Sequence, residues 1–187
     1  MSVHRLERTQ FVPIGMEEAW RFFSNPHNLA TLTPPAMGFE VTAHVPPEMY
    51  AGMMIPYRVR PLLSIPTGWL TEITHVEQQR FFVDEQRRGP YRLWHHEHHF
   101  EAVPGGVEMR DIVHYELPLG PLGDIVERLL VRPRIESIFA YRKRVLAGRF
   151  GGPAPARATA HVRESSLRSV RPSDGPADSA PVGSGPA

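Results

Sequence analysis

The chain has 187 residues, of which 41% are hydrophobic and 22% charged, and it carries a formal net charge of +1 at pH 7 and no cysteine. Its length and hydrophobic content are enough for one well-buried domain with some residues left over. The near-neutral charge gives no reason to expect a nucleic-acid partner, and the absence of cysteine excludes disulfides, thiolate catalysis and cysteine metal sites.

The N-terminal segment MSVHRLERTQ lacks the apolar core of a secretion signal. No part of the sequence approaches the run of roughly 20 apolar residues that spans a bilayer. The lack of cysteine is compatible with a reducing compartment. We therefore expect a cytoplasmic protein without a transmembrane segment.

The first 35 residues predict a strand followed by two short helices. Residues 3–13 alternate loosely between apolar and polar side chains, as in a strand. Residues 16–24 begin with acidic side chains and continue with Ala, Trp and two Phe, which is typical of a short buried helix. A second short helix over residues 26–32 should end before Thr33-Pro34-Pro35, because the residue before a proline disfavours the helical conformation.

The next part of the chain predicts strands over residues 39–44, 53–60 and 69–77. In the second of these, Ile55, Tyr57 and Val59 share one face. The proline-bounded segment between the second and third strands contains Leu62, Leu63 and Ile65. We interpret it as a loop that packs on its own domain, and the alternative is a cavity portal or a lip that touches a membrane.

Residues 81–118 predict three antiparallel strands, separated by turns at residues 88–90 and 104–106. In the middle strand Trp94, His96, His98 and Phe100 form the inward row, while His95, Glu97 and His99 form a solvated row. The inward row of the third strand is Val107, Met109, Asp111, Val113, Tyr115 and Leu117. A two-residue turn at Pro104-Gly105 would place His98 opposite Asp111, and a shift by one residue would make them diagonal neighbours.

In the first of these strands we expect Phe82, Asp84 and Gln86 to point inward. One sheet face then carries five polar side chains: Asp84, Gln86, His96, His98 and Asp111. Each buried polar group without a partner costs roughly 1 to 3 kcal/mol, so a solid core would not tolerate this arrangement. The pattern therefore predicts an internal cavity.

Residues 122–150 predict one long helix, with Pro133 kinking it or weakening one turn. Its expected apolar stripe is Ile125, Leu129, Ile138, Phe139, Val145 and Leu146. We expect Arg142, Lys143 and Arg144 to complement the helix dipole and meet solvent. Residues 151–187 contain no aromatic side chain and are rich in Gly, Pro, Ala and Ser. They predict a disordered tail after a folded domain at residues 3–150.

This order of elements resembles the helix-grip fold of the SRPBCC superfamily, which includes START and birch-pollen-allergen-like proteins and polyketide cyclase/dehydrase-like members. The segments AWRFFSNPHNLATLTPP, GWLTEI, FVDEQRRGPYRLWHHEHHFE, GGVEMRDIVHYELPLGPLG and IFAYR are similar to those of a bacterial ligand-binding subgroup. The resemblance implies an α+β fold in which a curved antiparallel sheet of about seven strands surrounds a long C-terminal helix. It also implies a cavity between sheet and helix, but the fold alone does not decide the function.

The favoured function is binding of a small, mainly hydrophobic molecule in this cavity. The expected ligand-binding residues are Tyr57, Phe82, Asp84, Gln86, Trp94, His96, His98, Met109, Asp111, Tyr115 and Phe139. The alternative is a cofactor-free cyclase, dehydratase or hydrolase in which His98 is the catalytic base and Asp111 orients it.

A third hypothesis is a metal site of two histidines and one carboxylate, made by His96, His98 and Asp111. The same residues could instead form a hydrogen-bonded cluster in which Asp111 orients His98, while Asp84 or Gln86 satisfies His96. We expect the hydrogen-bonded cluster, and hence neither a metal nor a cofactor.

Overall fold

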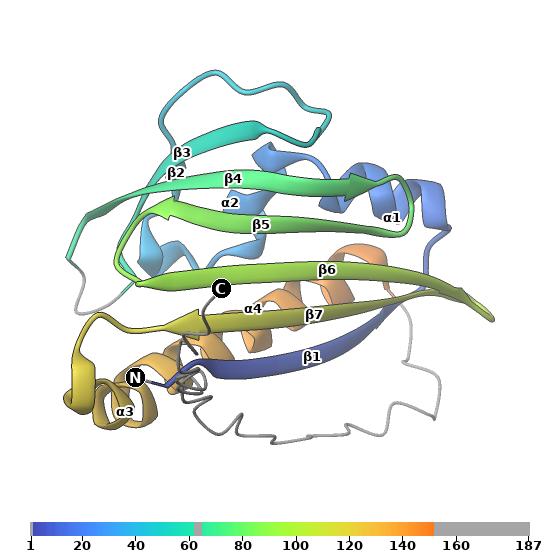
Figure 1. Cartoon of the computed structure of the whole chain (residues 1–187). Coiled ribbons are helices and arrows are strands. Elements are labelled where there is room, and N and C mark those ends of the chain that lie inside the picture. The colour runs from blue at the N-terminus through green and yellow to red at the C-terminus, as the bar shows by residue number, and fades with distance from the viewer. Residues whose placement is uncertain (1, 62–64, 152–187) are drawn as a thin grey trace, which may run out of the picture.

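The computed structural model describes residues 2–61 and 65–151. Seven strands form one antiparallel sheet in the order β1-β7-β6-β5-β4-β3-β2. The strands are β1 (His4–Val12), β2 (Glu40–Val41), β3 (Met53–Val59), β4 (Thr67–Glu77), β5 (Phe81–Arg88), β6 (Leu93–Val103) and β7 (Gly106–Glu116). The sheet curves, and the helices lie together behind it in Figure 1, so that one face of the sheet is covered.

Two short helices follow the first strand, and a long helical segment follows the last. The first group consists of α1 (Met16–Phe23), the 3-10 turn η1 (Pro26–Asn28), α2 (Leu29–Leu32) and the 3-10 turn η2 (Pro35–Met37). The second group consists of the 3-10 turn η3 (Gly120–Leu122), α3 (Gly123–Val126), the π-helical turn η4 (Glu127–Val131) and α4 (Arg132–Phe150). This arrangement confirms the predicted helix-grip α+β architecture.

The long helix α4 packs on the sheet through two core clusters. Towards its C-terminal end, Leu146 packs with α1, with the C-terminal half of β6 and with the N-terminal half of β7. At its start, Ile135 packs with Val113 and Tyr115 of β7 and with Leu6 of β1. The middle of the helix, between these clusters, faces the interior. None of the described helices combines the length and the apolarity that crossing a membrane requires.

The expected apolar stripe of the long helix is wrong in its first part. Ile125 and Leu129 are 57% and 67% exposed, whereas Glu127 and Val131 are buried. The buried stripe continues through Ile135, Arg142 and Leu146, so two of its members are charged. A search for apolar spacing alone therefore selects the wrong face in the first part of this helical segment, although Ile138, Phe139, Val145 and Leu146 do pack inward.

Pro133 does not kink the middle of a helix, because it lies in the first turn of α4. In a regular α-helix its ring would clash with the carbonyl group four residues earlier, and it has no N–H to donate. The wider π-helical turn η4 occupies these preceding residues. The proline therefore marks the boundary between two helical segments.

The predicted strand over residues 39–44 is shorter than expected, since β2 contains only Glu40 and Val41. Thr42 still donates its backbone N–H to the carbonyl of Pro56 on β3. Pro56 has no N–H to return, so the ladder between the two strands cannot continue there.

Two expectations concern residues beyond the described ranges: the disordered tail at residues 152–187, and the packing of Leu62 and Leu63. Ile65, which belongs to the same proline-bounded segment as Leu62 and Leu63, is 58% exposed.

Candidate functional site

A pocket of about 200 Å³, partly open to the surroundings and called the cavity below, lies between the sheet and α4. Most of its wall is aromatic or aliphatic and comes from β3, β4, β5, β6, α2 and α4. Tyr57, Trp69, Tyr91 and Trp94 contact one another along one part of the wall, with ring centroids 4.9 to 5.7 Å apart in the successive pairs. Polar side chains gather on β5 and β6, where Asp84, His96 and His98 reach the cavity.

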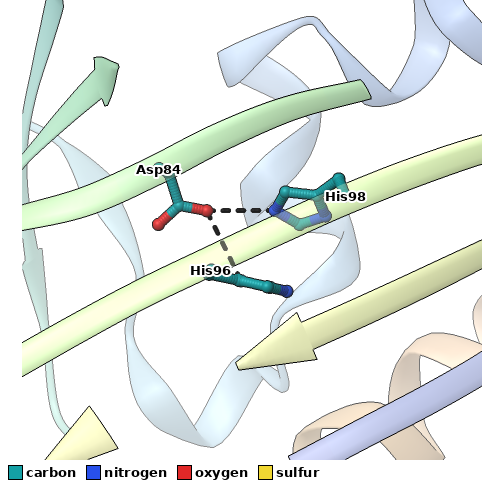
Figure 2. A group of neighbouring side chains, drawn as sticks. All are labelled: Asp84, His96 and His98. Atoms are coloured by element: carbon teal, nitrogen blue, oxygen red, sulfur yellow. Dashed lines mark hydrogen bonds and ion pairs between the residues drawn. The ribbon is translucent and has the colours of Figure 1, made fainter. Parts of the chain in front are cut away.

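The strand register places these polar side chains together. Asp84 on β5 pairs with His96 on β6, and His98 on β6 pairs with Asp111 on β7. Pro104 and Gly105 form the two-residue turn, since Val103 pairs with Gly106. The register that a two-residue turn predicts for β6 against β7 is therefore confirmed. Figure 2 shows the Asp84 carboxylate directed at both histidine rings.

Asp84 contacts both histidines through the same oxygen. Its Oδ2 lies 3.0 Å from Nε2 of His98 and 3.4 Å from Nδ1 of His96. The Trp94 side chain also hydrogen-bonds to this carboxylate. The two rings are tilted against each other, with centroids 3.8 Å apart and planes inclined by 40°.

Asp111 contacts the same two rings from the β7 side. Its Oδ1 lies 2.7 Å from Nδ1 of His98, 3.2 Å from Nε2 of His96 and 3.2 Å from Nη1 of Arg142. The contact with His98 is an ion pair and not an aligned hydrogen bond, because the ring nitrogen does not point at the oxygen. Each histidine therefore lies between two carboxylates, with one nitrogen towards each.

These contacts set the charges of the cluster. Burial opposes ionisation of both carboxyl groups, but His96 and His98 lower the pKa of Asp84, and Arg142 with the two histidines holds the pKa of Asp111 well below its usual value. Burial also opposes protonation of His98, yet its contacts with Asp111 and Asp84 raise its pKa. Burial and the neighbouring His98 lower the pKa of His96. The cluster thus favours a charged His98 and a neutral His96, and two cations balance two anions.

Arg142 was expected to meet solvent, and this is wrong. Its side chain is 10% exposed, lines the cavity and reaches Asp111 from α4. Its Nη2 also contacts the sulfur of Met109 at 3.2 Å, and its guanidinium lies over the ring of Phe23. The spacing from Ile135 to Arg142 and Leu146, seven and then four residues, is the sequence signal that places it on the buried face.

The structure brings seven of the eleven expected ligand-binding residues to the cavity wall and leaves four away from it. Those in the wall are Tyr57, Phe82, Asp84, Trp94, His96, His98 and Phe139. Asp111 lies behind the two histidines, and Met109 lies beneath Arg142. Tyr115 donates its hydroxyl to the buried carboxylate of Glu127 at 2.6 Å and is 1% exposed. The expectation that Asp111, Met109 and Tyr115 face the cavity is therefore wrong.

Gln86, the fourth residue away from the wall, holds the connection between β5 and β6. Its Nε2 donates to the carbonyl of Tyr91 at 2.6 Å, and its Oε1 accepts from the N–H of Tyr91 at 3.2 Å. Gly89 leaves room for this amide, since a Cβ there would lie 2.3 Å from the Gln86 oxygen. Gln86 therefore positions Tyr91, a cavity residue that the sequence did not single out.

Trp69 is a further wall residue that was predicted only as an alternating strand position. Its side chain is buried, and its indole Nε1 has no hydrogen-bond partner within the described part of the chain. The nearby hydroxyl groups of Tyr57 and Thr71 contact each other at 3.2 Å. The aromatic part of the wall thus contains one unused hydrogen-bond donor.

No protein-family model and no curated protein matches this sequence. Solved structures do match in fold. A START superfamily protein from Mycobacterium smegmatis is 12% identical with a TM-score of 0.59, over 79% of this chain and 97% of that one. Ginseng major latex-like protein 151 from Panax ginseng is 11% identical with a TM-score of 0.59, over 80% and 99% of the two chains. Ara h 8.0201 is 18% identical with a TM-score of 0.54, over 78% and 99%. The chain has the helix-grip fold of the START and birch-pollen-allergen-like proteins.

Proposed function

We propose that this protein binds one small, mainly hydrophobic molecule that carries a hydrogen-bonding group. The observation that carries the proposal is a pocket lined by aromatic and aliphatic side chains, with the polar groups Asp84, His96 and His98 at one place in its wall. Binding sites for small molecules typically combine an apolar lining with a few placed polar groups.

The cavity volume limits the size of the molecule. Drug-sized ligands occupy pockets of roughly 300 to 1,000 Å³, whereas this cavity measures about 200 Å³. The ligand is therefore smaller, of the size of one or two rings or a short alkyl chain. The flat faces of Trp69 and Trp94 in the wall favour stacking and edge contacts with a ring.

The polar side chains of the wall support a hydrogen-bonding group on the ligand. Asp84, His96 and His98 all reach the cavity, so a polar group of the ligand can lie beside them. The proposed ligand accordingly has a polar group that His96 can reach.

A polarity-sensitive naphthalene dye tests the proposal. We expect saturable binding at about one dye per chain, weakened by Phe139→Asp and by Trp94→Glu, because each change places a charge in the apolar wall. Leu129→Gln is the matched control, since Leu129 is exposed on the outer surface and can bind dye only nonspecifically. Near-ultraviolet circular dichroism verifies that each variant is folded. Dye binding that is lost in the control, or unaffected by both wall variants, would refute a ligand cavity.

A further inference from the structure

We propose that Asp84, His96 and His98 bind a divalent first-row transition-metal ion. The three ligand atoms, Oδ2 of Asp84, Nδ1 of His96 and Nε2 of His98, all lie within 4.8 Å of one another. They come from adjacent strands β5 and β6 and face the same point (Figure 2). The metal would bind to the polar groups of the cavity wall whether or not a hydrophobic ligand is present, so this inference goes beyond the function proposed above.

Two of the three separations between these atoms match those of ligands on one metal ion. The Asp84 oxygen lies 3.0 Å from the His98 nitrogen and 3.4 Å from the His96 nitrogen. With metal–ligand bonds of about 2.1 Å, these separations correspond to angles of roughly 90° and 110° at the metal, which belong to ordinary coordination geometries. The two histidine nitrogens lie within 4.8 Å of each other, whereas bonds of this length place two ligand atoms at most about 4.2 Å apart, so metal binding requires that the rings lie within or move into that limit.

The other nitrogen of each ring already lies beside a carboxylate, through a hydrogen bond from His96 and an ion pair with His98. A metal-binding histidine usually donates its second ring N–H to a carboxylate, which fixes the tautomer and the ring orientation. Here Oδ1 of Asp111 lies 3.2 Å from Nε2 of His96 and 2.7 Å from Nδ1 of His98. Arg142 holds the same oxygen from α4 at 3.2 Å. One buried carboxylate thus supports both rings.

The ligand set indicates the kind of ion. Two imidazoles and one carboxylate suit Zn²⁺, Fe²⁺ or Co²⁺, whereas Mg²⁺ and Ca²⁺ prefer oxygen ligands. Both rings also line the cavity. The remaining coordination positions therefore face the space in which a small molecule would lie.

Metal titration of untagged, chelator-treated protein tests the proposal with Zn²⁺ and Co²⁺ as probes. We expect one equivalent to bind to the wild type, loss of this stoichiometric binding in Asp84→Asn and in His96→Asn, and about 10- to 100-fold weaker binding in Asp111→Asn. The control is the double variant His95→Asn with His99→Asn, which removes the half-exposed histidines around Glu97 on the opposite sheet face. This variant should retain the stoichiometric site.

A measurement on the wild type keeps the test independent of variant folding. Bound Zn²⁺, which is diamagnetic, should shift the ring-proton NMR signals of His96 and His98, and leave those of His95 and His99 almost unchanged. Binding confined to the exposed histidines, or no stoichiometric binding at a few equivalents of either metal, would overturn the proposal.

Discussion

Replacing Asp111 by Asn tests the electrostatic design of the cluster. The carboxylate is 4% exposed, and a single oxygen meets His96, His98 and Arg142. Asparagine keeps the shape and one acceptor oxygen but removes the charge. The variant therefore leaves the buried guanidinium of Arg142 without its anion, while the wall of the cavity keeps its outline.

The expected cost follows from the burial of both partners. Removing one partner of a buried ion pair typically costs 3 to 5 kcal/mol, because the other charge remains uncompensated. The amide oxygen can still accept one hydrogen bond, so we expect a value near the lower end, about 3 kcal/mol. For a chain of this length, 1 kcal/mol corresponds to roughly 2 to 4 °C in melting temperature, so Tm should fall by about 6 to 12 °C.

Urea unfolding followed by tryptophan fluorescence in the presence of a chelator measures this cost without a contribution from metal. Glu97→Gln is the matched control on the neighbouring strand. Its carboxylate is 26% exposed and contacts two half-exposed histidines, His95 and His99, so its loss should cost about 0 to 1 kcal/mol. If the free energy of unfolding falls by the same small amount in both variants, the charge of Asp111 does not stabilise the buried cluster and the account of Asp111 is refuted.

Three further results are expected. Tyr115→Phe should lower the free energy of unfolding by about 1 to 3 kcal/mol in urea titrations, because the buried Glu127 loses a donor. The variant should leave dye binding unchanged, and weaker dye binding would mean that Tyr115 lines the cavity. Ile135→Ala should cost about 2 to 5 kcal/mol and Leu129→Ala less than about 0.5 kcal/mol in the same assay, and the reverse order would restore the stripe expected from sequence. Because the folded-state pKa of Asp111 is lowered, its stabilisation is complete above the unfolded value of about 3.9 and is lost as the pH falls through the folded value. The stability difference between wild type and Asp111→Asn should therefore shrink below about pH 4, and a constant difference would contradict the lowered pKa.

The sheet and the polar cluster could be predicted because short-range rules determine them. The period of two along β6 separates His96 and His98 from His95 and His99, and the Pro104-Gly105 turn fixes the register that places Asp111 beside His98. Pairing across adjacent strands then follows without knowledge of the rest of the fold.

The contribution of α4 could not be predicted from apolar spacing, because it depends on a partner in another element. Arg142 can be buried because Asp111 lies opposite it. Glu127 can be buried because Tyr115 and Arg132 donate to it. Charged residues on a helix normally face water, so each appears misplaced until its partner is known. The lining residues Trp69 and Tyr91 depend in the same way on how β4 and the β5–β6 connection curve around the cavity.

The most direct measurement of the cavity uses the three tryptophans of the chain as reporters. Trp69 and Trp94 line the cavity. Trp20 belongs to α1, packs against Phe82 and Phe100, and is not part of the wall. In ¹H–¹⁵N NMR spectra, addition of hexan-1-ol, a short-chain alcohol without an aromatic ring current of its own, should move the indole N–H signals of Trp69 and Trp94 until one equivalent is bound. The Trp20 signal should move far less. Signals of Trp69 and Trp94 that do not move at saturating hexan-1-ol, or a Trp20 shift as large as the other two, would contradict a binding cavity between the sheet and α4.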